Sequence, residues 1–209
     1  MPTFDVNNLL TGQGNLKLDL SFYQHPNVTR VARALLGKTL FTRVDGQTTA
    51  GIIVEAEAYS HREQGCHAYN NRLTPRNKVM FREGGHSYVY LCYGIHHLFN
   101  VVTNRTGVGD AVLIRALEPL RGLDVMMDRM GATSPRRITS GPGKLAKAMG
   151  IDRNLNGVLL SGPEAWIEEG IKVRRGAIQA DARIGIDYAG KDARLPWRFT
   201  IKGSEWLSR

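Results

Sequence analysis

The stretch KTLFTRVDGQTTAGIIVEAEAY, residues 38–59, contains two runs rich in β-branched and apolar residues, with Asp45-Gly46 between them. Asp-Gly favours the two-residue turn of a β-hairpin, because both positions of that turn need a positive φ. The stretch therefore predicts an antiparallel hairpin whose strands are residues 38–44 and 48–59.

Helices are expected before and after this hairpin in the sequence. Asn27 is a favourable N-cap, and the apolar spacing after it predicts a helix that ends at Gly37. Pro119 is expected to open a second helix that ends at Gly131, and a short third helix is expected to stop at Gly150. The apolar face of the second helix is expected to consist of Leu120, Leu123, Met127 and Met130.

Further strands are expected along the rest of the chain. They are predicted at residues 86–93, 96–104, 111–118, 157–160, 165–169, 173–178, 182–187 and 197–203. Because these strands do not alternate with helices, an α+β domain dominated by antiparallel strands is favoured over a doubly wound parallel sheet. Residues 60–85 are polar, basic and rich in turn formers, which predicts a long functional loop or a small irregular layer.

Length and composition limit the class of protein. A chain of 209 residues, of which 42% are hydrophobic, fits one domain, expected over residues 21–209 after a loose lead-in at residues 1–20. Lys and Arg outnumber Asp and Glu by 28 to 19, and the resulting charge of +9 suits a polyanionic partner, most often nucleic acid. Neither a membrane span nor a secretory signal is readable, and the two cysteines suggest no disulfide framework. An intracellular location is expected, in the cytoplasm or nucleoid if the source is bacterial.

The strand ending in EAEAY carries the first candidate for chemistry. Side chains alternate along a strand, so Glu55, Glu57 and Tyr59 share one face, with the carboxylates about 7 Å apart. Such a separation resembles the carboxylate pair of inverting glycoside hydrolysis. A solvated outer face is the alternative, but Tyr59 and the nearby His67 favour a pocket for a planar ring.

Aromatic residues at 88–95 form the second candidate. Tyr88 and Tyr90 fit a pocket wall or the core equally well. Tyr93-Gly94-Ile95 is expected at a hairpin tip, where a bulky aromatic side chain suits a wedge between stacked base pairs. Packing of these side chains into the core is the alternative.

Basic residues complete the set of candidates. Arg115 lies in an otherwise apolar strand, so it is expected either to pair with Glu57, keeping that carboxylate ionised, or to point outward. Arg72, Arg76, Lys78, Arg82, Arg136, Arg137, Ser140 and Lys144 can contact phosphates, although any one of them can equally be solvated surface. SGPGKL is not a phosphate-binding P-loop, since Ile138 replaces the first glycine and no Ser or Thr follows Lys144. No motif predicts a metal site or a cofactor.

The chain contains, in order, the segments VARALLGKTL, GIIVEAEAY, HAYNNRLTPRNKVMF, YVYLCYGIHHLFNVV, AVLIRALEP, SGPGKLAKAMGI and RFTIKGSEW. Together they resemble the alkyladenine-type 3-methyladenine DNA glycosylase family, and the resemblance extends over about residues 15–207. It implies a single-domain α+β fold with a curved, mainly antiparallel sheet and a few peripheral helices. It also implies a monofunctional enzyme that needs no cofactor and uses water to release a flipped, damaged purine.

The resemblance assigns a role to individual residues. Glu57 matches the catalytic base, and Arg115 matches the residue that helps it to hold a water. Tyr59, His67 and Tyr90 match residues that stack on the flipped base, Tyr93 matches the intercalating wedge, and Asn100 matches the pocket residue that rejects normal guanine. DNA contacts are expected from Arg76, Ile95, Ser140, Gly141, Lys144, Gly203 and Ser204. Two departures from the mammalian pattern are a segment between Tyr59 and His67 that is one residue shorter, and Ile95-His96 in place of a Met-Tyr pair.

The expected partner is double-stranded DNA containing 3-methyladenine, 7-methylguanine, hypoxanthine or ethenoadenine. The protein is expected to bind it as a monomer, and no membrane partner is expected. Three alternatives remain. A nucleic-acid-binding module without catalysis would use the same basic, aromatic surface. A glycosidase for free nucleosides would have little use for a positive surface or a wedge. A glycosylase with lyase activity would need an amine nucleophile, for which Lys144 is the candidate.

Overall fold

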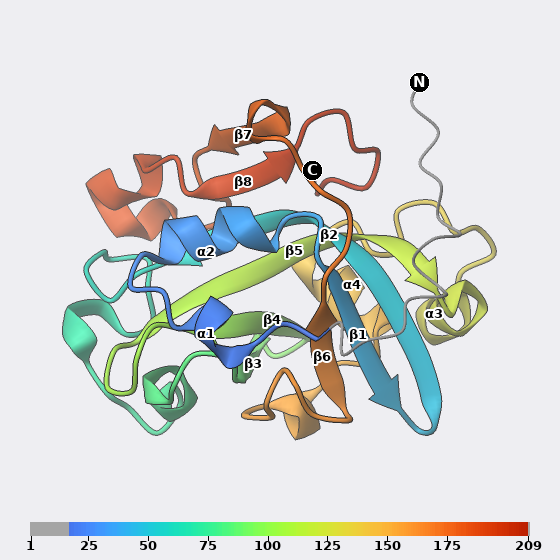
Figure 1. Cartoon of the computed structure of the whole chain (residues 1–209), viewed down its shortest axis with the longest axis horizontal. Helices are drawn as coiled ribbons and strands as arrows, with labels where there is room; N and C mark the ends of the chain where they lie inside the picture. Colours follow the sequence, from blue (N-terminus) through green and yellow to red (C-terminus); the bar gives the residue numbers. More distant parts are fainter. Residues whose placement is uncertain (1–16, 209) are drawn as a thin grey trace.

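The computed structural model describes residues 17–208, which form an eight-stranded sheet with helices around it (Figure 1). The strand order is β3-β4-β5-β2-β1-β6, and β8 pairs with both β2 and β7. All of these pairings are antiparallel, which confirms the predicted α+β class. The strands are β1 Thr39–Val44, β2 Gln47–Tyr59, β3 Ser87–Cys92, β4 His96–Thr103, β5 Asp110–Arg121, β6 Ala165–Glu168, β7 Ile178–Asp181 and β8 Arg198–Ile201.

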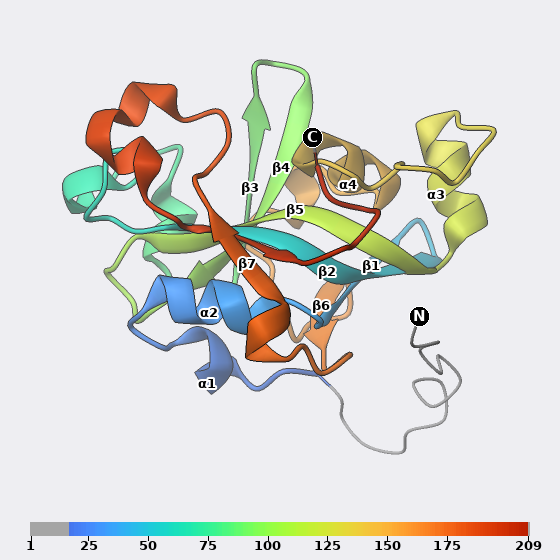
Figure 2. The ribbon, with the colours of Figure 1, turned by 90° about the horizontal axis from the view of Figure 1, so that it is seen from above.

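Helices cover both faces of the sheet. Figure 2 shows α1 and α2 on one face and α4 on the other. The α-helices are α1 Leu20–Tyr23, α2 Val28–Leu35, α3 Leu123–Met130 and α4 Pro142–Ala148. Short 3₁₀ helices are η2 Tyr69–Asn71, η3 Lys78–Phe81, η4 Arg153–Leu155, η5 Arg175–Ala177 and η6 Asp187–Arg194. The segment 60–85, which contains η2 and η3, is the predicted irregular layer. No helix within residues 17–208 is long and apolar enough to cross a membrane.

The predicted hairpin is confirmed as β1 and β2. Val44 pairs with Gln47, and the turn residues Asp45 and Gly46 have φ of 52° and 75°. The predicted helix cap is confirmed too, because the Asn27 side chain accepts a hydrogen bond from the Arg30 backbone N–H. The apolar side of α2 is buried against β2 in the main core.

The long strand β2 changes partner along one of its edges. Its first half pairs with β1, and residues Glu55–Glu57 pair with Thr200–Arg198 of β8. Its other edge follows β5, with register shifts on both sides of Glu55. The second half of β2 therefore lies in the middle of the sheet, where polar side chains are shielded from water.

The predicted start of the second helix at Pro119 is wrong. Pro119 belongs to β5 and lies opposite Gly51 next to a register shift, where a missing N–H is tolerated. The helix α3 begins only after Gly122, whose φ is 70° and whose added Cβ would lie 2.7 Å from a backbone oxygen. The fully buried residue of α3 is Met126, which the expected face did not include. Of that face, Met127 and Met130 are partly buried against the main core as predicted, whereas Leu123 is exposed and Leu120 lies in β5.

Three of the predicted strands are absent from residues 17–208. Residues 157–160 form turns with one isolated bridge at Leu159, and residues 173–178 contain η5. Residues 182–187 form an irregular segment with a bend at 184–185, which leads into η6 at Asp187. Short apolar runs between glycines were compatible with strands, but tertiary contacts hold them as loops. The third helix ends before Gly150 as expected, but α4 begins at Pro142, within the segment SPRRITSGPGK (134–144) that the sequence pattern predicts to be a loop.

Residues 1–16, most of the expected lead-in, lie outside the described residues. The first described residue, Lys17, forms an isolated bridge with Glu168 of β6, and α1 begins at Leu20. The domain boundary near residue 20 therefore stays a prediction.

Candidate active site

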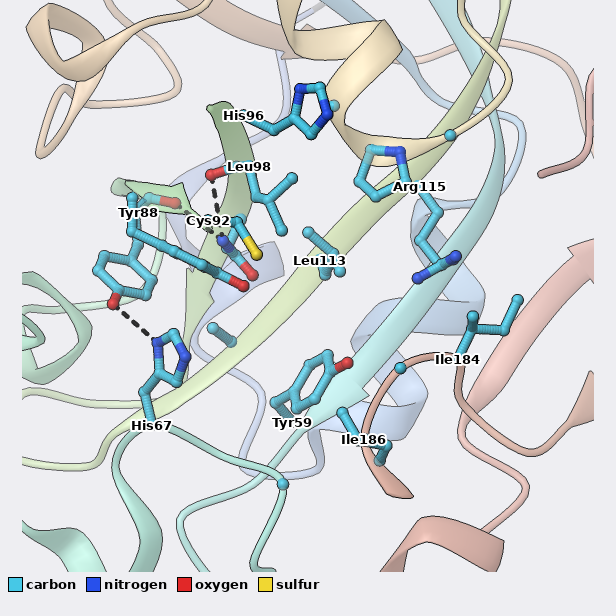
Figure 3. Close-up of a pocket in the computed structure, with 18 of the residues that line it drawn as sticks. Tyr59, His67, Tyr88, Cys92, His96, Leu98, Leu113, Arg115, Ile184 and Ile186 are labelled. Carbon is cyan, nitrogen blue, oxygen red and sulfur yellow. Dashed lines mark hydrogen bonds between the residues drawn. The ribbon is translucent and has the colours of Figure 1, made fainter. Parts of the chain in front are cut away.

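A cavity of about 690 Å³ opens beside the middle of the sheet. Its walls come from β2, β5, the β3–β4 hairpin, the irregular segment 60–85, the start of α4 and the loop 184–186 (Figure 3). Apolar and aromatic surface predominates, and a few polar side chains reach the interior. A cavity of this kind is typical of a small-molecule or base-binding site.

Glu57 lies directly behind this cavity and is fully buried. Its Oε2 accepts hydrogen bonds from the Tyr59 hydroxyl at 2.8 Å and from Arg115 Nη1 at 3.2 Å. Its Oε1 accepts the Ile184 backbone N–H at 2.8 Å. All three donor residues line the cavity, whereas Glu57 does not. The solvated outer face considered for this strand is therefore excluded.

Arg115 is buried and pairs with both carboxylates of the strand. Its Nε donates to Glu55 Oε1 at 2.9 Å, in addition to the bond from Nη1 to Glu57. The outward orientation is excluded, and the expected pair of Arg115 with Glu57 is present.

The pKa of Glu57 is raised above its ordinary value of 4.5, chiefly by burial. Arg115, the Ile184 N–H and the Tyr59 hydroxyl act in the opposite direction, and the neighbouring Glu55 adds to the increase. The expectation that Arg115 favours the ionised form holds in direction, but burial outweighs it. A raised pKa brings a carboxylate closer to the range in which it can accept and return a proton.

The aromatic wall of the cavity is built around His67. Its ring lies 4.6 Å from that of Tyr90, and its Nδ1 is 3.0 Å from the Tyr88 hydroxyl. Burial and the nearby Arg76 lower the pKa of His67 to about 4, so the ring is neutral at neutral pH. Tyr59, His67, Tyr88 and Tyr90 all line the cavity, and Tyr88 is itself buried. Tyr88 therefore belongs both to the hydrophobic core and to the wall of the cavity.

Asn100 also lines the cavity. Its Nδ2 donates to the backbone oxygens of Tyr88 at 3.0 Å and Leu98 at 3.5 Å. Since both bonds use the amide nitrogen, Oδ1 is the atom that this side chain can present to a bound molecule.

The tip of the β3–β4 hairpin projects away from the core. Tyr93 is 90% exposed with φ of 49°, and Ile95 is 71% exposed. Packing of these two side chains into the core is therefore excluded. Next to the tip, an added Cβ on Gly143 would lie 2.9 Å from the His96 ring, so α4 approaches the hairpin closely.

The residues expected to contact DNA divide into two groups. Arg76, Ser140, Gly141 and Lys144 line the cavity. Ile95 at the hairpin tip and the turn residues Gly203 and Ser204 are not part of the lining. Within residues 17–208, no group of three His, Cys, Asp or Glu side chains is placed to hold a metal ion.

Two features of the site were not foreseen from the sequence. The Ile184 N–H that bonds Glu57 comes from a segment expected to be a strand. Arg183 beside it forms a buried ion pair with Glu63 and lies 4.7 Å from the Tyr59 ring centre. An arginine within an apolar run was the available signal, as it was for Arg115.

Comparison with known proteins identifies relatives along nearly the whole chain. The profile of the family described as methylpurine-DNA glycosylase matches residues 21–205. A relative from Methanocella arvoryzae is 47% identical over 196 residues, covering 92% of this chain and 96% of its own. One from Chlamydia felis is 44% identical over 184 residues (87% and 94%), and one from Alkaliphilus oremlandii is 41% identical over 203 residues (93% and 100%). All three are named provisionally as 3-methyladenine DNA glycosylases. The chain belongs to the methylpurine-DNA glycosylase family.

Proposed function

We propose that this protein is a monofunctional DNA glycosylase of base excision repair, which hydrolyses the N-glycosidic bond of damaged purines. The observation that carries the proposal is the buried Glu57, held by Arg115 behind an aromatic cavity. The relatives' names point to 3-methyladenine as a substrate. The net charge of +9 suits a DNA substrate, and the protein is expected to act as a monomer in the compartment that holds the chromosome.

Access to the N-glycosidic bond requires that the nucleotide leave the base stack, at a cost of a few kcal/mol. Tyr93 at the hairpin tip is exposed and would fill the gap left in the duplex. Arg76, Ile95, Ser140, Gly141, Lys144, Gly203 and Ser204 are proposed to contact the DNA around it.

The flipped purine is proposed to lie among Tyr59, His67 and Tyr90. Alkylated purines such as 3-methyladenine carry positive charge, so electron-rich rings attract them by cation–π interaction. A neutral His67 adds no repulsion against such a base. Asn100 is proposed to exclude normal guanine from this position.

Glu57 would act as the base in hydrolysis. A carboxylate has about four acceptor sites, two on each oxygen. Tyr59 and Arg115 occupy both sites on Oε2, and Ile184 occupies one on Oε1. The second site on Oε1 is proposed to hold a water that reaches the buried carboxylate from the cavity. The water oxygen bonds to the sugar C1′ while its proton passes to Glu57. The C–N bond breaks with its electron pair leaving on the purine, which gives a free base and an abasic site.

The function is tested with duplexes that contain 3-methyladenine, 7-methylguanine, hypoxanthine or ethenoadenine, followed by strand cleavage at abasic sites. Cleavage is expected with at least one lesion and not with undamaged DNA, and it should weaken as salt rises. Binding without base release would indicate a non-catalytic module. Release of base from free nucleosides, at a rate insensitive to salt, would indicate the glycosidase for free nucleosides.

Lyase activity is tested separately at Lys144, which lines the cavity. Borohydride is expected to trap no covalent complex with damaged DNA, because the proposed nucleophile is water. A trapped complex that disappears in Lys144→Gln would replace the monofunctional mechanism.

Replacing the exposed Tyr93 by Ser is expected to reduce kcat/KM for a lesion in duplex DNA by about 10- to 100-fold, because one stacking contact contributes about 1–3 kcal/mol. The free energy of unfolding should change by less than about 0.5 kcal/mol. Tyr69→Ser, at a tyrosine outside the cavity lining, is the control. Equal losses in the two variants would remove the wedge role.

The rate of base release is expected to fall as the pH drops through the pKa of Glu57, because only the ionised carboxylate accepts a proton. Burial raises that pKa, so the acidic limb should lie above pH 4.5. Single-turnover rates on 7-methylguanine isolate this limb, since that base leaves without further protonation. A limb at or below pH 4.5 would contradict the assignment.

A further inference from the structure

Glu55 is a second fully buried carboxylate, two residues before the proposed base, and it does not line the cavity. Its Oε1 accepts from Arg115 Nε at 2.9 Å, from Arg198 Nη1 at 3.2 Å and from the Ser208 hydroxyl at 2.7 Å. Its Oε2 accepts the Ser208 backbone N–H at 2.7 Å. Burial of a carboxylate costs desolvation free energy even when it is well hydrogen-bonded, so we expect Glu55 to have a functional role.

Each nitrogen of the Arg115 guanidinium has a different partner. Nε donates to Glu55, Nη1 donates to Glu57, and Nη2 donates to the Ser208 hydroxyl at 3.2 Å. The guanidinium is planar and rigid, so partners on Nε and Nη2 fix the direction in which Nη1 points. That direction is toward Glu57 Oε2.

The hydrogen bond between Ser208 and Glu55 joins residues that are 153 positions apart in the sequence. The chain turns back after β8 at Gly203, where φ is 76°, and Trp206 packs against the main core. Figure 2 shows this last segment lying over β2 and β5. Ser208 is therefore placed next to Glu55 and Arg115 by the packing of this last segment, and not by strand pairing within the sheet.

We propose that Glu55 and Ser208 are positioning residues, which hold the plane of Arg115 so that Nη1 stays against Glu57. The proposal rests on the function assigned to Glu57 above. It makes Ser208, near the end of the segment that follows β8, part of the network that positions Arg115, although neither Ser208 nor Glu55 needs to touch the substrate.

The charges around Glu55 predict a change in the pKa of Glu57 that a purely structural role for Glu55 would not produce. Arg115 approaches it from β5 and Arg198 from β8, while Glu57 is its neighbour on β2. The next charge outward is Asp181 of β7, which bonds Arg198 at 3.4 Å. Glu55 raises the pKa of Glu57, so neutralising Glu55 should lower that pKa and leave Glu57 to the positive field of Arg115.

The test compares Glu55→Gln, Ser208→Ala and Ser208→Thr with the unaltered chain, using single-turnover release of 7-methylguanine. Displacement of a catalytic group by about 1 Å can cost about 100-fold in rate, so we expect Glu55→Gln to lose about 100-fold in kcat. Its affinity for the lesion duplex should be unchanged, and its acidic limb should move to lower pH. Ser208→Ala should lose about 10-fold, whereas Ser208→Thr keeps the hydroxyl and should retain the rate. Ser21→Ala, at an exposed serine of α1, is the matched control.

The outcomes separate this proposal from the proposed function. An unaltered chain that releases no base would remove both. If the unaltered chain is active and Glu55→Gln keeps its kcat and its acidic limb, the positioning role alone is overturned. Equal loss of activity and DNA affinity, without movement of the limb, would also overturn it in favour of a structural role. If Glu55→Gln does not fold, the decision rests on the Ser208 pair, and equal rates for Ala and Thr would reject the proposal.

Discussion

Glu57→Gln is expected to lose release of 7-methylguanine by about 1000-fold while retaining affinity for the lesion duplex. A general base contributes about 10²–10⁴-fold, and a neutral amide can neither accept the proton nor stabilise positive charge at C1′. Glutamine is close to glutamate in size, so the aromatic wall and the exposed Tyr93 should stay in place. Single-turnover rates measure the first effect, and fluorescence anisotropy with the same duplex measures the second.

Glu168→Gln is the control, because Glu168 lies on β6 at the edge of the sheet and bonds only the Trp166 indole among side chains of residues 17–208. It should release base at the normal rate. Wild-type turnover by Glu57→Gln would end the proposed mechanism. Loss of DNA affinity in proportion to rate would instead mean that the substitution had disturbed the whole cavity.

Local signals predicted the parts of the fold that local contacts determine. Asp45-Gly46 fixed the hairpin turn, and Asn27 began α2 through a bond to a backbone N–H three residues later. Pro119 misled because a proline is favourable both at the start of a helix and beside a bulge. Only the pairing of Pro119 in β5 with Gly51 in β2, which is 68 residues earlier in the sequence, decides between them.

The candidate site shows the same division. Strand alternation placed Glu57 and Tyr59 on one face, and their side chains share a hydrogen bond of 2.8 Å. The cost of burying Arg115 predicted a carboxylate partner for it. The sequence could not predict that Glu55 would share that arginine, or that Ser208 and the Ile184 N–H would complete the network, because the fold alone brings these segments together.

Arg183→Met is expected to have the largest effect on stability, about 3–5 kcal/mol, because it leaves Glu63 buried without its charge partner. The pair is bidentate, with Arg183 Nη1 and Nη2 at 2.6 Å and 2.7 Å from the two carboxylate oxygens. Arg183 also donates to the Ala58 oxygen at 2.9 Å and lies 5.3 Å from the Trp197 ring centre. Equilibrium urea unfolding of the variant and the unaltered chain measures the loss.

The second substitution, Glu63→Met in the same chain, distinguishes an unpaired charge from lost packing. If the penalty comes from the stranded carboxylate, the double variant should recover most of the stability, since buried pairs can often be replaced by apolar residues. It also removes Arg183 Nε, which is buried with no hydrogen-bond partner among residues 17–208. A double variant as unstable as Arg183→Met would show that the arginine acts through its contacts with Tyr59 and Trp197. In that case the loop carrying Ile184 should loosen, and base release should fall further than DNA affinity.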